Sequence, residues 1–233
     1  MIRVENLNAG YGKLQVLFGV DFVAEQGKIT AVVGPNGSGK STLLKAIAGI
    51  ARIFSGRVYV GGVDVTEKPP HERARLGLAY LQQVKNVFYN LTVEENLRMA
   101  AYNLDEEEYR KRLEEVLEVV PLKQYLKRRT SELSGGWRQM VAVGMSLMRK
   151  AKFFMFDEPT AQLSPKFASD ILAIVRRLRD MGYTVVLAEQ NAKKALEISD
   201  TAYLLVSGRV SYEGSAQALL ENRELGRLYL GLI

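Results

Sequence analysis

The stretch AVVGPNGSGKST, residues 31–42, decides the fold of this chain. Four residues follow Gly34 before a Gly-Lys-Ser run, which is the spacing of a phosphate-binding loop. The apolar run Ile29–Val33 predicts a buried strand before the loop, and Leu43–Ala48 predicts a helix after it. Strand, loop and helix in this order aim backbone N–H groups and a helix N-terminus at phosphate oxygens.

The residue types in this loop favour nucleotide binding over a glycine-rich turn that binds nothing. Glycines let the backbone turn tightly, the Lys40 ammonium neutralises charge on β- and γ-phosphates, and the Ser41 hydroxyl is a ligand for Mg2+. The predicted nucleotide contacts in the loop are Gly34, Pro35, Asn36, Gly37, Ser38, Gly39, Lys40, Ser41 and Thr42.

A second motif, FFMFDEP at residues 153–159, predicts a buried strand that ends in two carboxylates. Ligands bind at the carboxyl ends of strands in open α/β sheets, so Asp157 is placed to hold Mg2+. Glu158 follows at once and would orient and polarise an attacking water. Two surface acids after a strand are the alternative, and the phosphate-binding loop upstream argues against it.

These segments predict an α/β fold, a P-loop NTPase (RecA-like) core with a mostly parallel sheet and an antiparallel β edge near the N-terminus. Helix-type patterning replaces the β signal between about residues 84 and 150, which predicts a helical subdomain inserted into the core (1–83 and 151–233) of a single domain. The predicted strands are Ile2–Leu7, Val16–Ala24, Ile29–Val33, Val58–Val60, Phe153–Phe156, Thr184–Ala188 and Ala202–Val206.

Composition limits the remaining classes. The sequence of 233 residues contains no cysteine, which excludes disulfides and thiolate metal sites. The net charge of +6 leaves nucleic acid open as a partner, but the basic clusters at 123–129 and 176–179 lack interleaved aromatic residues. Residues 1–7 do not read as a signal peptide, and no run approaches the roughly 18 apolar residues of a membrane span. We therefore expect any service to a membrane to run through partners.

The segment TSELSGGWRQM, residues 130–140, places two glycines at the start of a predicted helix, where each costs about 1 kcal/mol relative to alanine. Its LSGG run, Leu133–Gly136, resembles the signature motif of the ABC ATPase superfamily, and the order of the other motifs also matches. Glycines here leave the backbone N–H groups and the Ser134 hydroxyl uncovered, as a second anion-binding helix terminus. The resemblance implies that Ser134, Gly135 and Gly136 bind the γ-phosphate held by a second subunit, with two chains paired head to tail around two ATP molecules.

Further roles follow from this resemblance by position. Tyr11, in AGYGKLQ, would stack on adenine. Gln83, in LAYLQQVKN, would reach Mg2+ and the attacking water; Gln82 is its rival, and the family pattern GIAYVPQ favours Gln83. Val84–Tyr89 would contact the transmembrane partner, and Glu158 would be the general base.

Three segments depart from the broad family pattern. Ala161–Pro165 (AQLSP) lacks the aspartate that is usual there. Glu189–Asn191 (EQN) stands where a histidine usually contacts the γ-phosphate, and we expect the Gln190 amide to make that contact as a neutral catalytic donor. Trp137 replaces the polar residue after LSGG, and a large aromatic side chain beside the γ-phosphate site is expected to affect dimer closure.

The EQN segment and the loop ending in Leu-x-Pro resemble the ATP-binding subunits of branched-chain amino acid importers, particularly the LivF-type member. Residues 77–97 and the YLG run at 229–231 fit the same subfamily. The resemblance implies a subunit that hydrolyses ATP with Mg2+ to power import of branched-chain or other hydrophobic amino acids. Its partners would be a second nucleotide-binding subunit, in a homo- or heterodimer, and permease subunits that hold it at the cytoplasmic face of the membrane. It would not touch the solute.

Two functions of other kinds remain as alternatives. One is a nucleic-acid-associated ABC ATPase, which the basic charge favours and the lack of a long heptad run, a second P-loop or a cysteine-bound zinc disfavours. The other is a soluble ATP-binding assembly or regulatory module, which has no need of the Glu158 base. His71, the only histidine, lies in a proline-marked segment that we read as a loop before a strand, and we expect no catalytic role for it.

Overall fold

The computed structural model describes residues 1–83 and 86–230. Its centre is a six-stranded sheet in the order β10-β9-β3-β8-β7-β6. The strands from β9 to β6 are parallel, and β10 pairs antiparallel with β9 at one edge. The bounds are β3 Ile29–Val33, β6 Leu78–Leu81, β7 Phe153–Asp157, β8 Thr184–Ala188, β9 Thr201–Val206 and β10 Arg209–Ser215.

The middle strands β3, β7 and β8 are buried on both faces, as their continuous apolar runs predict. Their side chains alternate between two cores. Phe154 and Phe156 enter a core shared with helices α5 (Gly135–Met148) and α6 (Pro165–Asp180), while Phe153 and Met155 enter a core shared with α1 (Lys40–Ile47). The sheet is therefore a wall between two apolar cores, and only its edges and ends are open to ligands.

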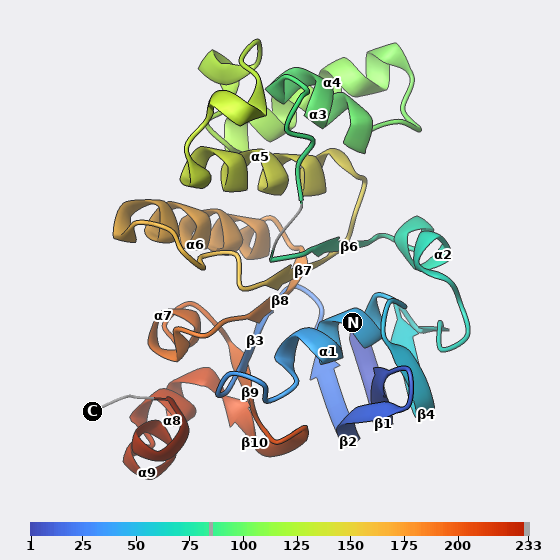
Figure 1. Ribbon diagram of the computed structural model, residues 1–233, viewed down its shortest axis with the longest axis vertical. Coiled ribbons are helices and arrows are strands. Elements are labelled where there is room, and N and C mark those ends of the chain that lie inside the picture. Colours follow the sequence, from blue (N-terminus) through green and yellow to red (C-terminus); the bar gives the residue numbers. More distant parts are fainter. Residues whose placement is uncertain (84–85, 231–233) are drawn as a thin grey trace.

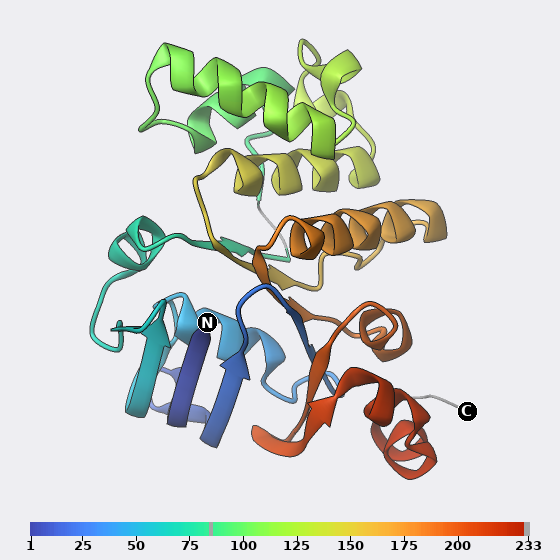
Figure 2. The same ribbon diagram turned by 180° about the vertical axis from the view of Figure 1, so that it is seen from behind.

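A second, antiparallel sheet covers α1 from the other side, in the order β2-β1-β4-β5. Its strands are β1 Ile2–Tyr11, β2 Leu14–Ala24, β4 Arg52–Val60 and β5 Val63–Asp64. Figure 2 shows β1, β2 and β4 side by side, next to the lower part of the central sheet. The antiparallel strands near the N-terminus thus form a sheet of their own, and the antiparallel edge of the central sheet is β10, from the C-terminal part of the chain.

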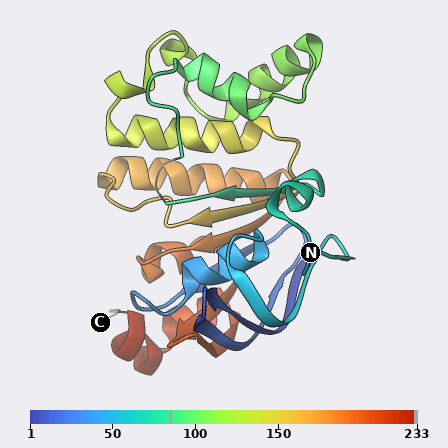
Figure 3. The ribbon, with the colours of Figure 1, turned by 45° about the vertical axis from the view of Figure 1, so that its right-hand side comes forward.

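A layer of helices lies above the sheet. Figures 1 and 3 show α5 lying over α6, and α6 over the strands. A capping box starts α3, because Thr92 Oγ1 accepts from the Glu95 N–H and the Glu95 carboxylate accepts from the Thr92 N–H. The layer consists of α3 Val93–Ala100, α4 Glu106–Val119, the 3-10 turns Lys123–Tyr125 and Thr130–Glu132, and α5.

Short helices complete the core. Helix α2 (Pro70–Arg75) contains His71, so the reading of this segment as a loop is wrong: Pro70 fits the first turn of a helix, where no N–H partner is needed. None of the helices among residues 1–83 and 86–230 combines the length and apolarity needed to cross a bilayer. The helices near the C-terminus are α7 Ala192–Leu196, α8 Ala216–Glu221, α9 Arg223–Leu225 and the π-helical turn Gly226–Leu230.

A buried guanidinium fastens α2 to the end of α1. Arg73 is 2% exposed and donates to the carbonyl oxygens of Ala46 and Ile47, at 2.7 and 2.9 Å. It also donates to the carbonyls of Thr66 and Lys68, at 2.9 and 2.7 Å. A cation at this position satisfies the last carbonyls of α1 and complements the helix dipole.

We predict that Arg73→Met lowers the free energy of unfolding by about 2–4 kcal/mol, because it removes four hydrogen bonds to the carbonyl oxygens of Ala46, Ile47, Thr66 and Lys68. Arg75→Met is the control, since Arg75 is an exposed arginine on the same helix. Urea unfolding of both variants and the parent measures the difference. Equal stabilities of the two variants would show that the Arg73 contacts contribute nothing.

Candidate functional site

The loop between β3 and α1 is shaped for a close approach of backbone to ligand. Gly34 has a φ of 149°, and a Cβ there would lie 2.1 Å from the carbonyl oxygen of Leu205. Gly39 caps α1 without a side-chain hydrogen bond, which leaves the first amides of the helix available. The Ser38 hydroxyl is buried and has no partner among the described residues. Open amides and an unpaired hydroxyl at one helix start are suited to an anion.

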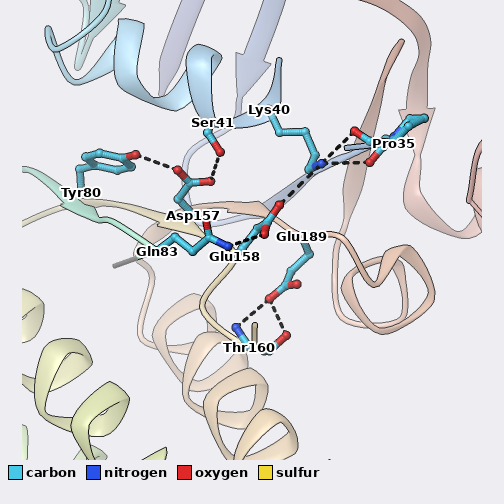
Figure 4. A network of polar contacts seen from close by, with 10 residues as sticks. Pro35, Lys40, Ser41, Tyr80, Gln83, Asp157, Glu158, Thr160 and Glu189 are labelled. Atoms are coloured by element: carbon cyan, nitrogen blue, oxygen red, sulfur yellow. Dashed lines mark hydrogen bonds and ion pairs between the residues drawn. The ribbon is translucent and has the colours of Figure 1, made fainter. Parts of the chain in front are cut away.

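Lys40 lies inside this loop, only 4% exposed. Its ammonium donates to the carbonyl oxygens of Gly34 and Pro35, at 3.0 and 3.2 Å, and lies 3.7 Å from Glu158 Oε1 (Figure 4). Two neutral carbonyls and one distant carboxylate are weak partners for a buried cation compared with phosphate oxygens. The side chain is therefore held where it would meet a bound phosphate.

Asp157 ends β7 and engages both of its carboxylate oxygens. Oδ1 accepts from the Ser41 hydroxyl at 2.7 Å, and Oδ2 accepts from the Tyr80 hydroxyl at 2.8 Å. Burial and the neighbouring Asp157 carboxylate raise the pKa of Tyr80, so the phenol stays a neutral donor. The hydroxyl and carboxylate oxygens of Ser41 and Asp157 are the hard ligands that Mg2+ prefers. No cluster of three acidic or histidine side chains suited to a metal occurs among residues 1–83 and 86–230.

Glu158 is the first residue after β7 and has a φ of 47°. Its Oε2 accepts from Gln83 Nε2 at 2.9 Å. Gln82, the rival of Gln83, contributes a backbone carbonyl to Asn86 instead. The geometry thus separates the two glutamines, and Gln83 is the one whose amide lies beside the carboxylate.

Tyr11 lies at the end of β1 and is 42% exposed. Its hydroxyl oxygen is 3.4 Å from Thr42 Oγ1, and Lys45 Nζ lies 5.8 Å from the centre of its ring. The Tyr11 side chain therefore lies beside the first two turns of α1, the helix that follows the phosphate-binding loop.

The LSGG run lies at the start of α5. Ser134 is its N-cap without a side-chain hydrogen bond, so this helix start is as open as that of α1. A Cβ on Gly136 would lie 2.4 Å from the Phe167 ring, which explains a glycine there. In Figure 1, helix α6 lies between α5 and the β3–α1 loop. The two open helix starts of one chain thus do not face a common ligand.

Trp137 packs within the protein. Its ring makes a tilted contact with Tyr125, at 4.3 Å between centroids, and an edge contact with Phe167, at 5.4 Å. This aromatic stack joins the start of α5 to the first turn of α6, beside the segment Ala161–Pro165. The indole belongs to the packing between the two helices, which the sequence alone does not reveal.

The two residues that follow β8, Glu189 and Gln190, lie in different environments. Gln190 is exposed, while Glu189 is 3% exposed and accepts from the Thr160 N–H and hydroxyl, at 3.0 and 2.7 Å. Sequence reasoning missed Glu189, Thr160 and Tyr80. A signal for Glu189 was available, because it follows an apolar strand just as Asp157 ends one. Of the expected partner-contact segment, Val84 and Lys85 lie outside the described residues, and Phe88 and Tyr89 are exposed.

A phosphate-binding loop after β3, with an acidic pair at the end of β7 on the other side of β8, defines a P-loop nucleotide hydrolase. The family model of the ABC transporter matches residues 17–161. A protein of Archaeoglobus fulgidus described as a probable branched-chain amino acid transport ATP-binding protein, LivF, is 54% identical, over 100% of both chains. The chain belongs to the ABC transporter family, as one of its ATPase cassettes.

Other relatives agree with this assignment. The high-affinity branched-chain amino acid transport ATP-binding protein BraG of Pseudomonas aeruginosa is 38% identical, over 99% of this chain and 100% of its own. A solved ATP-binding cassette in its ADP conformation superposes with a TM-score of 0.88 at 30% identity, over 97% of each chain. A dimeric cassette in a post-hydrolysis state, bound to ADP and Pi, superposes with a TM-score of 0.83 at 26% identity, over 93% of this chain and 99% of that one.

We predict a pH-dependent stability difference between the parent and Glu189→Gln. Burial raises the pKa of Glu189, so the folded chain holds this proton more tightly than the unfolded chain does. Its contribution to stability is therefore fully present below the ordinary carboxyl pKa and is lost as pH rises through the raised pKa. Glutamine is neutral throughout, so the stability of the parent minus that of the variant should fall as pH rises from about 4.5. Urea unfolding across a pH series measures it, and a constant difference would contradict a raised pKa.

Proposed function

We propose that the chain binds ATP through the β3–α1 loop and hydrolyses it at the junction of Lys40, Asp157 and Glu158. One observation carries the proposal: two polar clusters lie side by side (Figure 4). One joins Asp157 to Ser41, the other joins Lys40 to Glu158 and Glu158 to Gln83, and Lys40–Ser41 and Asp157–Glu158 are consecutive pairs. A cation, a pair of hard ligands and a carboxylate gathered at one place are the groups that phosphoryl transfer to water requires.

Each residue has a distinct part in this chemistry. The Lys40 ammonium exchanges its carbonyl partners for β- and γ-phosphate oxygens and neutralises their charge. Glu158 accepts the proton of the attacking water, and the Gln83 amide holds that water and the carboxylate together. Tyr11, at the edge of the site, stacks on adenine. The Gln190 amide donates to a γ-phosphate oxygen without changing charge near neutral pH.

Ser41 and Asp157 would hold Mg2+, with Gln83 reaching it from the neighbouring loop. When bound, Mg2+ neutralises charge on the β- and γ-phosphates. Tyr80 fixes the Asp157 carboxylate by its hydrogen bond to Oδ2 and leaves Oδ1 with Ser41. The chain's own contribution is thus a carboxylate whose orientation is set before any ligand binds.

The second anion-binding helix start implies a second subunit. Helix α5, which begins at Gly135 after its N-cap Ser134, is separated from the β3–α1 loop of its own chain by helix α6 (Figure 1). Ser134, Gly135 and Gly136 are free to complete the site of a partner, with two cassettes paired head to tail. A solved relative that is a dimer bound to ADP and Pi supports the pairing of two cassettes. The partner is a second copy or a related subunit.

The relatives identify the physiological role that we propose. The LivF protein and BraG are both described as branched-chain amino acid transport ATP-binding proteins. We assign this chain to import of branched-chain or other hydrophobic amino acids, at the cytoplasmic face of the membrane through permease subunits. Nucleic-acid work and a purely regulatory role have no counterpart among these relatives, and the acidic pair with its glutamine favours turnover.

A groove on the helical layer fits the permease contact. Two adjoining hollows between α2, α3 and α5 share Ala100 and Arg149. Around them stand Phe88, Met99 and Tyr102, which are 48%, 50% and 83% exposed. Exposed aromatic and methionine side chains in a hollow mark a protein contact. Phe88 belongs to the segment Val84–Tyr89, which begins directly after Gln83. A partner in the groove would therefore contact a residue that is close in sequence to the catalytic glutamine.

We predict that Glu158→Gln keeps ATP binding and loses turnover by roughly 10²- to 10⁴-fold, because an amide cannot accept the proton of the water. The trapped ATP should hold two cassettes together, and size-exclusion chromatography with ATP and Mg2+ measures this. The matched control is Glu197→Gln, at the exposed glutamate that caps the C-terminus of α7. A Glu158→Gln protein that binds ATP and stays monomeric at high concentration would contradict the shared site in a homodimer.

Gln190→Ala should slow turnover by about 10- to 150-fold with little change in ATP affinity, if a hydrogen bond to charge is made mainly in the transition state. His71→Gln removes the only imidazole in the chain and should leave turnover of the isolated cassette nearly intact. Steady-state ATPase assays compare the two. If His71→Gln were inactive and Gln190→Ala active, the assignment of the γ-phosphate contact to Gln190 would be wrong.

A further inference from the structure

Glu189 is a buried carboxylate that the phosphate-binding machinery leaves unused. It follows β8 directly and is 3% exposed. Figure 4 shows its side chain pointing toward Thr160 and away from Lys40. Glu189 makes no ion pair among the residues that the structure describes, so hydrogen bonds offset its burial, chiefly the two from Thr160 and to a smaller extent one from the Gln190 backbone. A position that needed only filling would favour an apolar side chain.

Those two hydrogen bonds fix the turn that carries Glu158. The turn consists of Glu158, Pro159 and Thr160, and proline has no N–H. The Glu158 N–H donates to the Ala188 carbonyl at 2.9 Å, and the Thr160 N–H donates to Glu189 Oε1 at 3.0 Å. Both amide donors of the turn are thus bound to consecutive residues at the end of β8.

This fixation matters because Glu158 has an unfavourable backbone conformation. Its φ of 47° lies in the left-handed region, where a non-glycine residue is held only when its surroundings impose it. The Thr160 hydroxyl adds a second bond to the same Glu189 oxygen, at 2.7 Å. The Ala188 carbonyl thus holds the first residue of the turn, Glu158, and the Glu189 carboxylate holds the last, Thr160.

Glu189 is itself anchored on strand β3. Its N–H donates to the Val32 carbonyl at 3.2 Å, next to the start of the phosphate-binding loop. The following residue is Gln190, which we assign to the γ-phosphate. One residue therefore connects the strand before the phosphate-binding loop, the turn of the general base and the γ-phosphate contact.

We propose that Glu189 is a positioning residue for ATP hydrolysis, which through Thr160 holds the Glu158 carboxylate in line with the water. It touches neither ATP nor the water. This inference rests on the proposed role of Glu158 as general base. A misplacement of about 1 Å at a reacting group costs on the order of 10²-fold in rate, so a loosened turn should act on kcat rather than on ATP binding.

The test compares variants that differ in one hydrogen bond. Thr160→Val removes the hydroxyl donor, and Thr160→Ser restores it. Glu189→Leu removes the acceptor, and Glu189→Gln keeps an acceptor oxygen of the same reach. We expect kcat to fall roughly 10- to 100-fold in Thr160→Val and Glu189→Leu, with KM for ATP within about threefold of the parent. Thr160→Ser and Glu189→Gln should retain most of the turnover, and Glu189→Leu combined with Thr160→Val should be no slower than Glu189→Leu alone.

A control separates positioning from stability. Thr30→Val removes a buried hydroxyl that lies 2.9 Å from Thr201 Oγ1, away from the site, and should lower the melting temperature without lowering kcat. All assays run well below the melting temperature of each variant. Parent-like kcat in Thr160→Val and Glu189→Leu would overturn the inference, as would a Thr160→Ser as slow as Thr160→Val. Turnover by Glu158→Gln would instead refute the proposed function, so the two failures are distinguishable.

Discussion

The register of three parallel strands is the constraint on which the site depends. Ala188 on β8 lies opposite Val32 on β3 and opposite Asp157 on β7, so all three strands end at one level. Their loops leave the sheet at the same edge, which is where open α/β sheets bind ligands. A slip of one residue in the β7 pairing would turn the Asp157 side chain to the opposite face and away from Ser41.

The electrostatic design follows from this edge. One buried ammonium, that of Lys40, lies between neutral carbonyls and the Glu158 carboxylate, while Asp157 is occupied by two hydroxyl donors. The negative groups are held by hydrogen bonds and the positive group by weak partners. A bound triphosphate would therefore meet a cation whose carbonyl partners are easily replaced, and carboxylates that are already oriented. Catalysis by positioning requires such preorganisation.

The fold and the main site residues could be predicted because their signals are local. The seven predicted strands are all present in the structure. The phosphate-binding loop and the acidic pair can each be recognised from about ten consecutive residues. Strand β10 has mixed polar and apolar residues and gives no comparable signal. The bonds between Thr160 and Glu189, and the packing of Trp137 on Phe167, join residues about 30 positions apart in sequence. They depend on strand register and on α5 lying over α6, and neither can be read from the segments themselves.

The central claim is that Lys40 is the cation for nucleotide phosphates, and titration of two nucleotides tests it most directly. Isothermal titration with ATP and with AMP would compare the parent with Lys40→Met, and with Lys45→Met on the same helix as control. The account predicts that Lys40→Met weakens ATP binding by roughly 10- to 150-fold, leaves AMP binding unchanged, and that Lys45→Met preserves the ratio of the two affinities. Equal weakening of ATP and AMP by Lys40→Met, or no weakening of either, would contradict it.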